Sequence, residues 1–140
     1  MNTITNYKER DFVWPTDFYS DGLNCGLREN RPDLGWLVSK LPAQAAGVYT
    51  TNKFCAAPTA ITKQLVSANH MLQCVVMNSV NANSFTGQQG ILDVHSEQQA
   101  VAEKLGVSSS LVGVASTGLI GSYLPIEKIL KGIKQLKATQ

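Results

Sequence analysis

The chain has 140 residues, of which 44% are hydrophobic and 16% are charged, and its formal net charge is +2. This length suits one domain that buries roughly two-thirds of the surface exposed by its unfolded chain. The composition excludes a disordered or collagen-like chain. The scattered basic residues form no stripe that could follow a nucleic-acid backbone, except near the carboxyl end. The low share of charged residues indicates that part of the surface contacts another protein chain.

Neither a membrane segment nor a secretory signal is visible. No apolar run approaches the ~18 residues that a membrane-spanning helix needs, and the charged residues 8–11 are not followed by an apolar stretch. Cys25, Cys55 and Cys74 are odd in number, far apart and not at a metal-ligand spacing from any histidine. We therefore expect a cytoplasmic protein with reduced thiols and without a metal, a bound cofactor, a nucleic-acid partner or a membrane partner.

In chain order, the first predicted element is an amino-terminal arm over residues 1–21, which are polar and aromatic. Beyond it, short apolar runs bounded by turn residues predict strands. The predicted strands cover residues 36–38, 46–50, 59–62, 74–77 and 111–115. The run 74–77 has the clearest pattern of a buried strand, because it is continuously apolar and ends at a polar pair.

Two amphipathic helices follow from the pattern of apolar residues. Thr86 and Gln89 have the spacing of a capping box, and the apolar residues after them keep a period near 3.6 until Gly106. A second helix is predicted to begin near Pro125, with Glu127 favourable in its first turn. Its apolar face consists of Ile126, Ile129, Leu130, Ile133 and Leu136. These elements predict a single layered α/β domain over residues 1–140, in which both helices pack on one face of a β-sheet.

Two loops each follow a buried strand and precede a helix, which is where α/β folds place their sites. The first, residues 78–87, is rich in Asn and small hydroxyl residues, and this composition also suits an ordered turn. In the second, residues 115–121, Thr117 and Gly118 allow hydrogen-bond donors to point at a developing negative charge. The same loop could cradle a phosphate, although it lacks the lysine of a P-loop. A tight turn is the default structure for this sequence.

No residue has the surroundings of a catalytic nucleophile. No serine lies in a Gly-x-Ser-x-Gly elbow, and no cysteine has a nearby histidine. His70 and His95 are isolated histidines, for which a surface or helix-face role is favoured. Lysine recurs at every third position from Lys128 to Lys137, which is typical of a solvated basic face. The residues by themselves indicate an oxyanion hole without a nucleophile.

Three ordered blocks resemble the ornithine acetyltransferase family of arginine biosynthesis, also known as glutamate N-acetyltransferases. Residues 42–53 are similar to its Ala-Ala-Gly-Val-Phe-Thr-Thr-Asn segment. Residues 78–90 resemble its Asn-Ser-Gly-Asn-Ala-Asn-Ala-Cys-Thr-Gly signature, and residues 115–121 its Ala-Ser-Thr-Gly-Val-Ile-Gly block. The similarity extends over residues 22–133. It implies the fold of the amino-terminal part of the family's α chain.

The resemblance also implies an acyltransferase that moves an acetyl group from N-acetylornithine to glutamate, and some members accept acetyl-CoA as a co-substrate. Family precursors cleave themselves into α and β chains, and the threonine that begins the β chain becomes the nucleophile. The implied partner is therefore the β chain of the same precursor, in an α2β2 heterotetramer. The family's oxyanion hole falls on Thr117 and Gly118 of this sequence.

The chain departs from the family pattern at several positions. Val80 stands where the family usually has glycine, so the loop there is expected to differ or to serve a less demanding site. Phe85 replaces a common cysteine, and Thr139 is not followed by the Thr-Asp of the family's cleavage region. We therefore expect a truncated α chain that is inactive without its β chain. One alternative is a non-catalytic domain with a structural or self-association role, and another is a small-ligand or phosphate-binding module built on residues 116–121.

Overall fold

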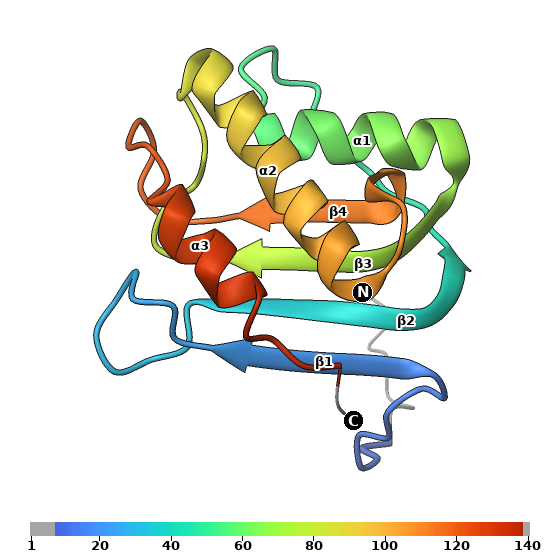
Figure 1. Ribbon diagram of the computed structural model, residues 1–140. Coiled ribbons are helices and arrows are strands. Elements are labelled where there is room, and N and C mark those ends of the chain that lie inside the picture. The colour runs from blue at the N-terminus through green and yellow to red at the C-terminus, as the bar shows by residue number, and fades with distance from the viewer. Residues whose placement is uncertain (1–7, 139–140) are drawn as a thin grey trace.

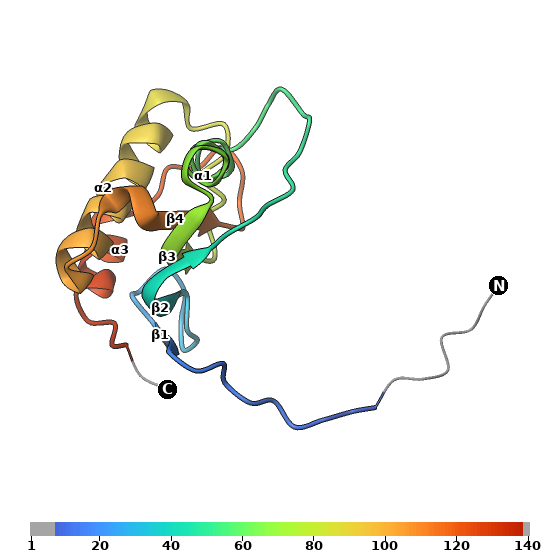
Figure 2. The same cartoon turned by 90° about the vertical axis from the view of Figure 1, so that its right-hand side faces the viewer.

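The computed structural model describes residues 8–138, which form a four-stranded sheet with two helices packed on one face and a third helix along the edge of the last strand (Figures 1 and 2). The elements are β1 (Phe18–Leu23), β2 (Leu34–Gln44), α1 (Ala57–Asn69), β3 (Met71–Asn78), α2 (Gly87–Leu105), a 3-10 turn (Ser109–Leu111), β4 (Val112–Ser116) and α3 (Ile126–Ile133). The strand order is β1-β2-β3-β4. The first two strand pairs are antiparallel, and β3 and β4 are parallel. The predicted α/β class is confirmed.

The hydrophobic core lies between the sheet and the helices α2 and α3. Because side chains alternate along a strand, Trp36, Val76 and Val114 all face this side, and each is buried. Ile129 and Ile133 of α3 pack into the same core and are 0% exposed. These contacts confirm that both predicted amphipathic helices bury their apolar stripes on one face of the sheet.

Three of the five predicted strands are confirmed, and two are wrong. The confirmed runs lie in β2, β3 and β4. Residues 46–50 form no strand, because β3 begins at Met71 and the pairing of β2 with it ends at Gln44. Residues 59–62 lie inside α1, whose first turn contains Pro58. Proline at the start of a helix is favourable, since its fixed φ suits the first turn and it has no N–H to leave unbonded.

Helix α1 covers the free edge of β4. The Thr62 hydroxyl donates to the Val114 carbonyl oxygen and accepts the Val114 N–H, both at 3.1 Å. Edge strands expose unpaired backbone groups that can recruit another strand. A single side chain from α1 satisfies both backbone groups of Val114 and so blocks strand addition at this residue.

The sheet begins inside the segment that was expected to form an arm. β1 starts at Phe18, and residues 18–21 pair with residues 36–39 of β2. Residues 8–17 form no helix or strand, and residues 1–7 lie outside the described part of the chain. The alternation in β1 was hidden in the sequence because its residues are mostly polar or small.

The ends of α2 were predicted with mixed success. Gly106 ends the helix in a left-handed conformation with φ 68°, as predicted. The prediction of a capping box is wrong, since the Thr86 side chain makes no cap hydrogen bond. Its hydroxyl instead donates to Asn83 Oδ1 at 2.7 Å, and Gln89 Nε2 donates to Asp93 Oδ1 at 2.8 Å. Thr86 has a ψ of 2° rather than the extended conformation of a usual N-cap.

Candidate active site

The two loops singled out in the sequence lie side by side. β3 and β4 are parallel neighbours, so both end at the same edge of the sheet (Figure 1). The Thr117 N–H donates to the Asn78 carbonyl oxygen at 3.1 Å. The Leu119 N–H donates to Val80 O at 2.8 Å, and the Ala82 N–H to Leu119 O at 2.9 Å. The structure therefore joins both candidate loops into one assembly.

Thr117 and Gly118 are exposed at the end of β4. The backbone N–H of Thr117 is not available to a substrate, because it is bonded to Asn78 O. Neither the Thr117 hydroxyl nor the Gly118 N–H has a hydrogen-bond partner within residues 8–138. Two adjacent donors are thus left open, one from a side chain and one from the backbone.

Only glycine fits at position 118. Its φ of 134° is a conformation that residues with a side chain rarely adopt. A Cβ at this position would collide with the carbonyl group of Val80. Gly118 therefore lets the two loops approach closely and holds its own N–H in a fixed position.

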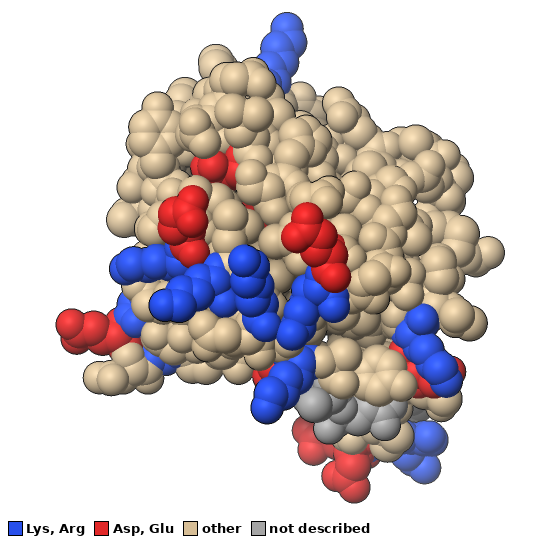
Figure 3. All heavy atoms as spheres, in the orientation of Figure 1, with Lys and Arg blue, Asp and Glu red and all other residues tan. Residues whose placement is uncertain are grey.

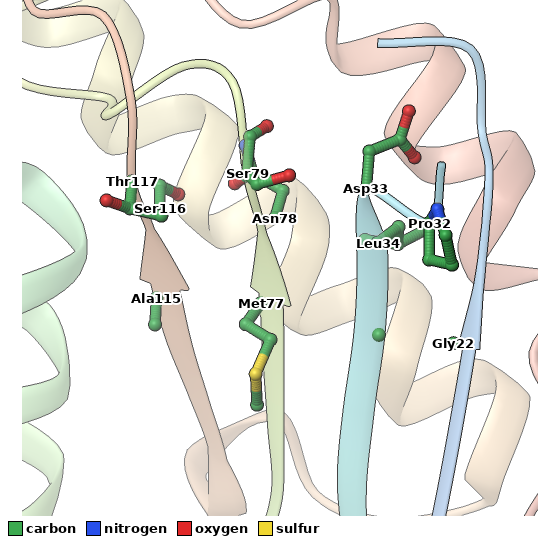
Figure 4. A pocket seen from close by; sticks show the side chains of 11 residues that line it. Gly22, Pro32, Asp33, Leu34, Met77, Asn78, Ser79, Ala115, Ser116 and Thr117 are labelled. Carbon is green, nitrogen blue, oxygen red and sulfur yellow. The ribbon is translucent and has the colours of Figure 1, made fainter. Parts of the chain in front are cut away.

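A pocket of about 500 Å³ opens on the uncovered face of the sheet at these strand ends (Figure 4). Asn78, Ser79 and Thr117 lie at its polar end, and Figure 4 shows Met77 and Ala115 further down the two strands. A few polar groups beside a mainly apolar surface are the usual composition of a small-molecule site. Thr117, one of the two predicted site residues, lines this pocket, and Gly118 follows it in the chain.

Two buried polar atoms at the same strand ends lack a hydrogen-bond partner among the described residues. They are Asn78 Oδ1 and Ser116 Oγ, whose residues are in register across β3 and β4. The amide of Asn78 is oriented by its Nδ2, which donates to the carbonyl oxygens of Ser79 and Asn81 at 3.1 Å each. Buried polar atoms are usually satisfied in native proteins. Both atoms are shielded from solvent, so neither is open to a ligand in the pocket.

Val80 holds the backbone conformation that favours glycine. Its φ is 85°, which a β-branched residue rarely adopts. The hydrogen bond from Leu119 to the Val80 carbonyl and the close packing of Gly118 hold it there. Strain of this kind costs on the order of 1–3 kcal/mol. Val80 therefore has a backbone conformation that suits the glycine usually found in the family, and valine adopts it only with strain.

We expect Val80→Gly to raise the stability of the protein by about 1 kcal/mol. The relief of strain is partly offset by the greater backbone entropy of glycine in the unfolded chain. The matched control is Val48→Gly, at a fully exposed position without positive φ, which should be neutral or mildly destabilising. Melting temperatures of the three proteins provide the measurement. A loss of stability in V80G equal to or larger than that in V48G would show that Val80 is not strained in the folded protein.

The connection between β1 and β2 lies at the same end of the sheet as the carboxyl ends of β3 and β4. The Ser79 N–H donates to Asp33 O at 2.8 Å, and Arg28 Nη2 donates to Ser79 Oγ at 2.7 Å. The Asp33 carboxylate accepts the N–H groups of Cys25, Leu27 and Arg28 at 2.7–3.1 Å. Burial opposes ionisation of Asp33, but these hydrogen bonds outweigh it and hold the pKa of Asp33 below its ordinary value.

Arg28 and Asp33 were not identified in the sequence. The one signal available was the residue type of Asp33, because Asp and Asn side chains often organise tight loops. Their contribution arises from bonds to Ser79, which is distant in the sequence, so no local pattern contains it.

The remaining candidates do not line this pocket. Cys25, Cys55 and Cys74 are free thiols. Burial raises the pKa of Cys74 to about 12, and burial together with Asp33 raises the pKa of Cys25 to about 12, so both are poor nucleophiles. His70 ends α1 in a left-handed conformation, and His95 Nδ1 lies 3.0 Å from Gln98 Oε1.

Over residues 8–138, no three His, Cys, Asp or Glu side chains gather closely enough to hold a metal ion. None of the helices in this part of the chain is long and apolar enough to cross a membrane.

Comparison with known proteins matches this chain to one family. The model of the ArgJ family matches residues 19–140. The arginine biosynthesis bifunctional protein ArgJ of Lactiplantibacillus plantarum is 52% identical over 142 residues, covering 100% of this chain and 35% of the relative. The protein of the same name from Oceanobacillus iheyensis is 50% identical, covering 100% of this chain and 34% of the relative. The chain thus spans about a third of the length of these relatives.

Solved structures agree with the sequence matches. The crystal structure of arginine biosynthesis bifunctional protein ArgJ from Bacillus halodurans has a TM-score of 0.85 and 38% identity, and covers 89% of this chain and 65% of that chain. Ornithine acetyltransferase complexed with ornithine, from Mycobacterium tuberculosis, has a TM-score of 0.82 and 36% identity, and covers 87% of this chain and 66% of that chain. The family model, the identity of the relatives and the shared fold lead to one conclusion: this chain belongs to the ArgJ family and corresponds to its amino-terminal portion.

Proposed function

We propose that this chain is part of the α chain of an ornithine acetyltransferase and supplies the oxyanion hole for acetyl transfer from N-acetylornithine to glutamate. The observation that carries the proposal is the pair of open donors at the end of β4, the Thr117 hydroxyl and the Gly118 N–H. Membership of the ArgJ family, whose relatives are named as arginine biosynthesis proteins, supports the same reaction.

The chemistry needs donors that are in place before the reaction begins. When a nucleophile attacks the acetyl carbonyl, negative charge develops on its oxygen, and Thr117 and Gly118 would donate to that oxygen. The bond from the Thr117 N–H to Asn78 O and the packing of Gly118 on Val80 hold both donors in position. Little reorganisation is then required at the transition state.

The nucleophile in this proposal is a threonine that begins the β chain, with its own α-amine as the base. Its hydroxyl oxygen forms a bond to the acetyl carbon, the amide bond of N-acetylornithine breaks, and ornithine leaves with the transferred proton on its amine. The amine of glutamate then attacks the acetyl-enzyme ester, the bond between the acetyl carbon and the threonine oxygen breaks, and a proton from the amine restores the threonine hydroxyl, which completes a ping-pong cycle. The same oxyanion hole serves both steps.

The proposal extends to the assembly and its surroundings. The partner is the β chain of the same precursor, separated by self-cleavage, and two copies of each chain form an α2β2 heterotetramer. Acetyl-CoA can serve as an alternative acetyl donor, no bound cofactor is needed, and the enzyme works in the cytoplasm.

The test compares the isolated 140-residue chain with the full-length protein that contains it. We expect the full-length protein to transfer the acetyl group from N-acetylornithine to glutamate, and the isolated chain to show no turnover, because it lacks the nucleophile. Intact-mass measurement of the native protein should detect separate α and β chains. Turnover by the isolated chain at the full-length rate would contradict the proposal that the nucleophile lies on the β chain. An inactive full-length protein with an uncleaved mass would favour the non-catalytic, self-associating alternative.

A further inference from the structure

We propose that the full-length enzyme also transfers acyl groups longer than acetyl, and that their alkyl chains lie in the pocket beside Thr117. The inference rests on the proposed function, because it uses the same oxyanion hole and the same nucleophile. The threonine oxygen of the β chain bonds to the acyl carbon, the amide C–N bond of an N-acylornithine breaks, and ornithine leaves with the proton. The amine of glutamate then takes the acyl group and returns a proton to the threonine oxygen. Only the size of the transferred group differs from acetyl transfer.

The floor of this pocket is a row of residues in register across the four strands. Gly22 of β1 pairs with Gly35 of β2, Gly35 pairs with Met77 of β3, and Met77 pairs with Ala115 of β4. Because side chains alternate along a strand, Thr117, two positions beyond Ala115, faces the same side of the sheet as this row. Figure 4 shows Met77 and Ala115 side by side below Thr117. The oxyanion-hole residue and the floor therefore belong to one pocket.

The pocket is much larger than an acetyl group. Its volume of about 500 Å³ lies within the range of roughly 300–1,000 Å³ that is usual for drug-sized ligands. Packing accounts for the glycine at position 35, since a Cβ there would lie 3.0 Å from the Asp21 carbonyl oxygen. At position 22 the φ is not positive, and a Cβ would meet only Leu34 O at an ordinary 3.6 Å. The fold therefore does not require Gly22, and the missing side chain leaves the pocket wide.

The lining of the pocket favours an alkyl chain over the charged part of the substrate. Within residues 8–138, no Lys, Arg or His side chain lines it. The one carboxylate of the lining, that of Asp33, already accepts three backbone N–H groups. Figure 3 shows Lys and Arg side chains gathered over α3, on the helix-covered side of the molecule. A buried amino-acid carboxylate or amine would lack a partner here, which is costly, whereas burial of methylene groups is favourable.

An acyl chain bound at Thr117 reaches this floor with its first few carbons. A carbonyl oxygen about 2.8 Å from the Thr117 hydroxyl places the first alkyl carbon roughly 5 Å from that hydroxyl. Ala115 lies about 7 Å back along β4, and Met77 lies on the neighbouring strand, about 4.8 Å across. A chain that follows the floor therefore contacts Ala115 and Met77 with the carbons that an acetyl group lacks. The Met77 side chain is 42% exposed, and its flexible thioether can adapt to chains of different length.

The test measures kcat/KM of the full-length enzyme for N-acetylornithine and for N-butanoylornithine, with glutamate as the acceptor. We expect the butanoyl donor to be used at least as well as the acetyl donor, because each additional buried methylene improves binding by about fourfold.

Ala115→Leu fills the floor next to Thr117. We expect it to lower kcat/KM for the butanoyl donor by about 10-fold or more relative to the acetyl donor. Ala115 is exposed in this chain, so the fold should tolerate the larger side chain. The matched control is Ala68→Leu, at an exposed position of α1, which should leave the ratio of the two kcat/KM values unchanged.

Two results would overturn the proposal. A lower kcat/KM for the butanoyl donor than for the acetyl donor is the outcome expected if another part of the full-length protein fills the pocket. An equal effect of A115L on both donors would show that Ala115 does not contact the alkyl chain. If A115L does not fold, Ala115→Val decides by the same comparison, because a β-branched residue suits a strand. A parent enzyme that transfers no acetyl group would refute the proposed function, whereas acetyl transfer without butanoyl transfer would refute only this inference.

Discussion

Replacing Thr117 by alanine in the full-length protein is expected to lower kcat by about 100- to 1,000-fold, while KM changes little. The Thr117 N–H is bonded to Asn78 O, so the hydroxyl is the donor that this residue can offer to an oxyanion. Folding should survive, because the side chain is exposed and makes no hydrogen bond within the described chain. Steady-state kinetics with N-acetylornithine and glutamate measure both constants.

Thr117→Ser is the matched control, since it keeps the hydroxyl and removes only a methyl group. It should retain most of the activity that T117A loses. A kcat in T117A within about threefold of the parent would show that the hydroxyl is not the donor. Gly118 offers no equally clean test, because a Cβ there would collide with Val80 and any loss of activity would also report disturbed packing.

Stability is expected to fall as the pH rises from about 4.5 to about 8, because of Glu97. This side chain is 0% exposed, and neither carboxylate oxygen has a partner among the described residues. Burial, together with the negative charge of Asp93, raises the pKa of Glu97 from its ordinary 4.5 to about 8. The folded protein therefore keeps a proton that the unfolded chain releases near its ordinary pKa.

The direction follows from proton linkage. Between the two pKa values the folded state binds more protons than the unfolded state, so raising the pH favours unfolding. The stability associated with protonated Glu97 is complete below pH 4.5 and is lost as the pH rises through about 8. Each unit of pKa difference corresponds to about 1.4 kcal/mol, so the total is several kcal/mol.

Glu97→Gln should remove this dependence, because glutamine stays neutral and has nearly the same shape. We expect E97Q to match the parent protein near pH 5 and to be several kcal/mol more stable near pH 8.5. The control is Glu103→Gln, an exposed position on the same helix. Denaturant midpoints at the two pH values provide the measurement, and parallel pH dependence in parent and E97Q would rule out a protonated Glu97.

Several elements could be predicted because their signals are local. β3 was visible as a continuous apolar run that ends at Asn78, and α3 as a stripe of apolar residues that starts near Pro125. The sequence predicted that this helix ends at Gly106, and α2 does end there in the structure. In each case the backbone conformation depends on residues within a few positions.

Other elements needed contacts between distant residues. β1 is polar along most of its length and becomes a strand by pairing with β2. Residues 59–62 have β-branched members but lie in α1, where Thr62 satisfies the edge of β4. The capping-box prediction was wrong because the Thr86 hydroxyl donates its hydrogen bond to Asn83 instead. Tertiary contacts outweighed local propensity in all three cases.

The sequence by itself determined that Thr117 and Gly118 stand in a loop after a buried strand, and the motif around them indicated the family. Only the tertiary structure decided which of their donors are open. The Thr117 N–H is taken by Asn78, a residue on a neighbouring strand, and Gly118 is held against the strained Val80. The same holds for Arg28, which reaches this edge through a bond to Ser79. Hydrogen bonds between chain segments depend on how the sheet assembles, and no local sequence pattern encodes them.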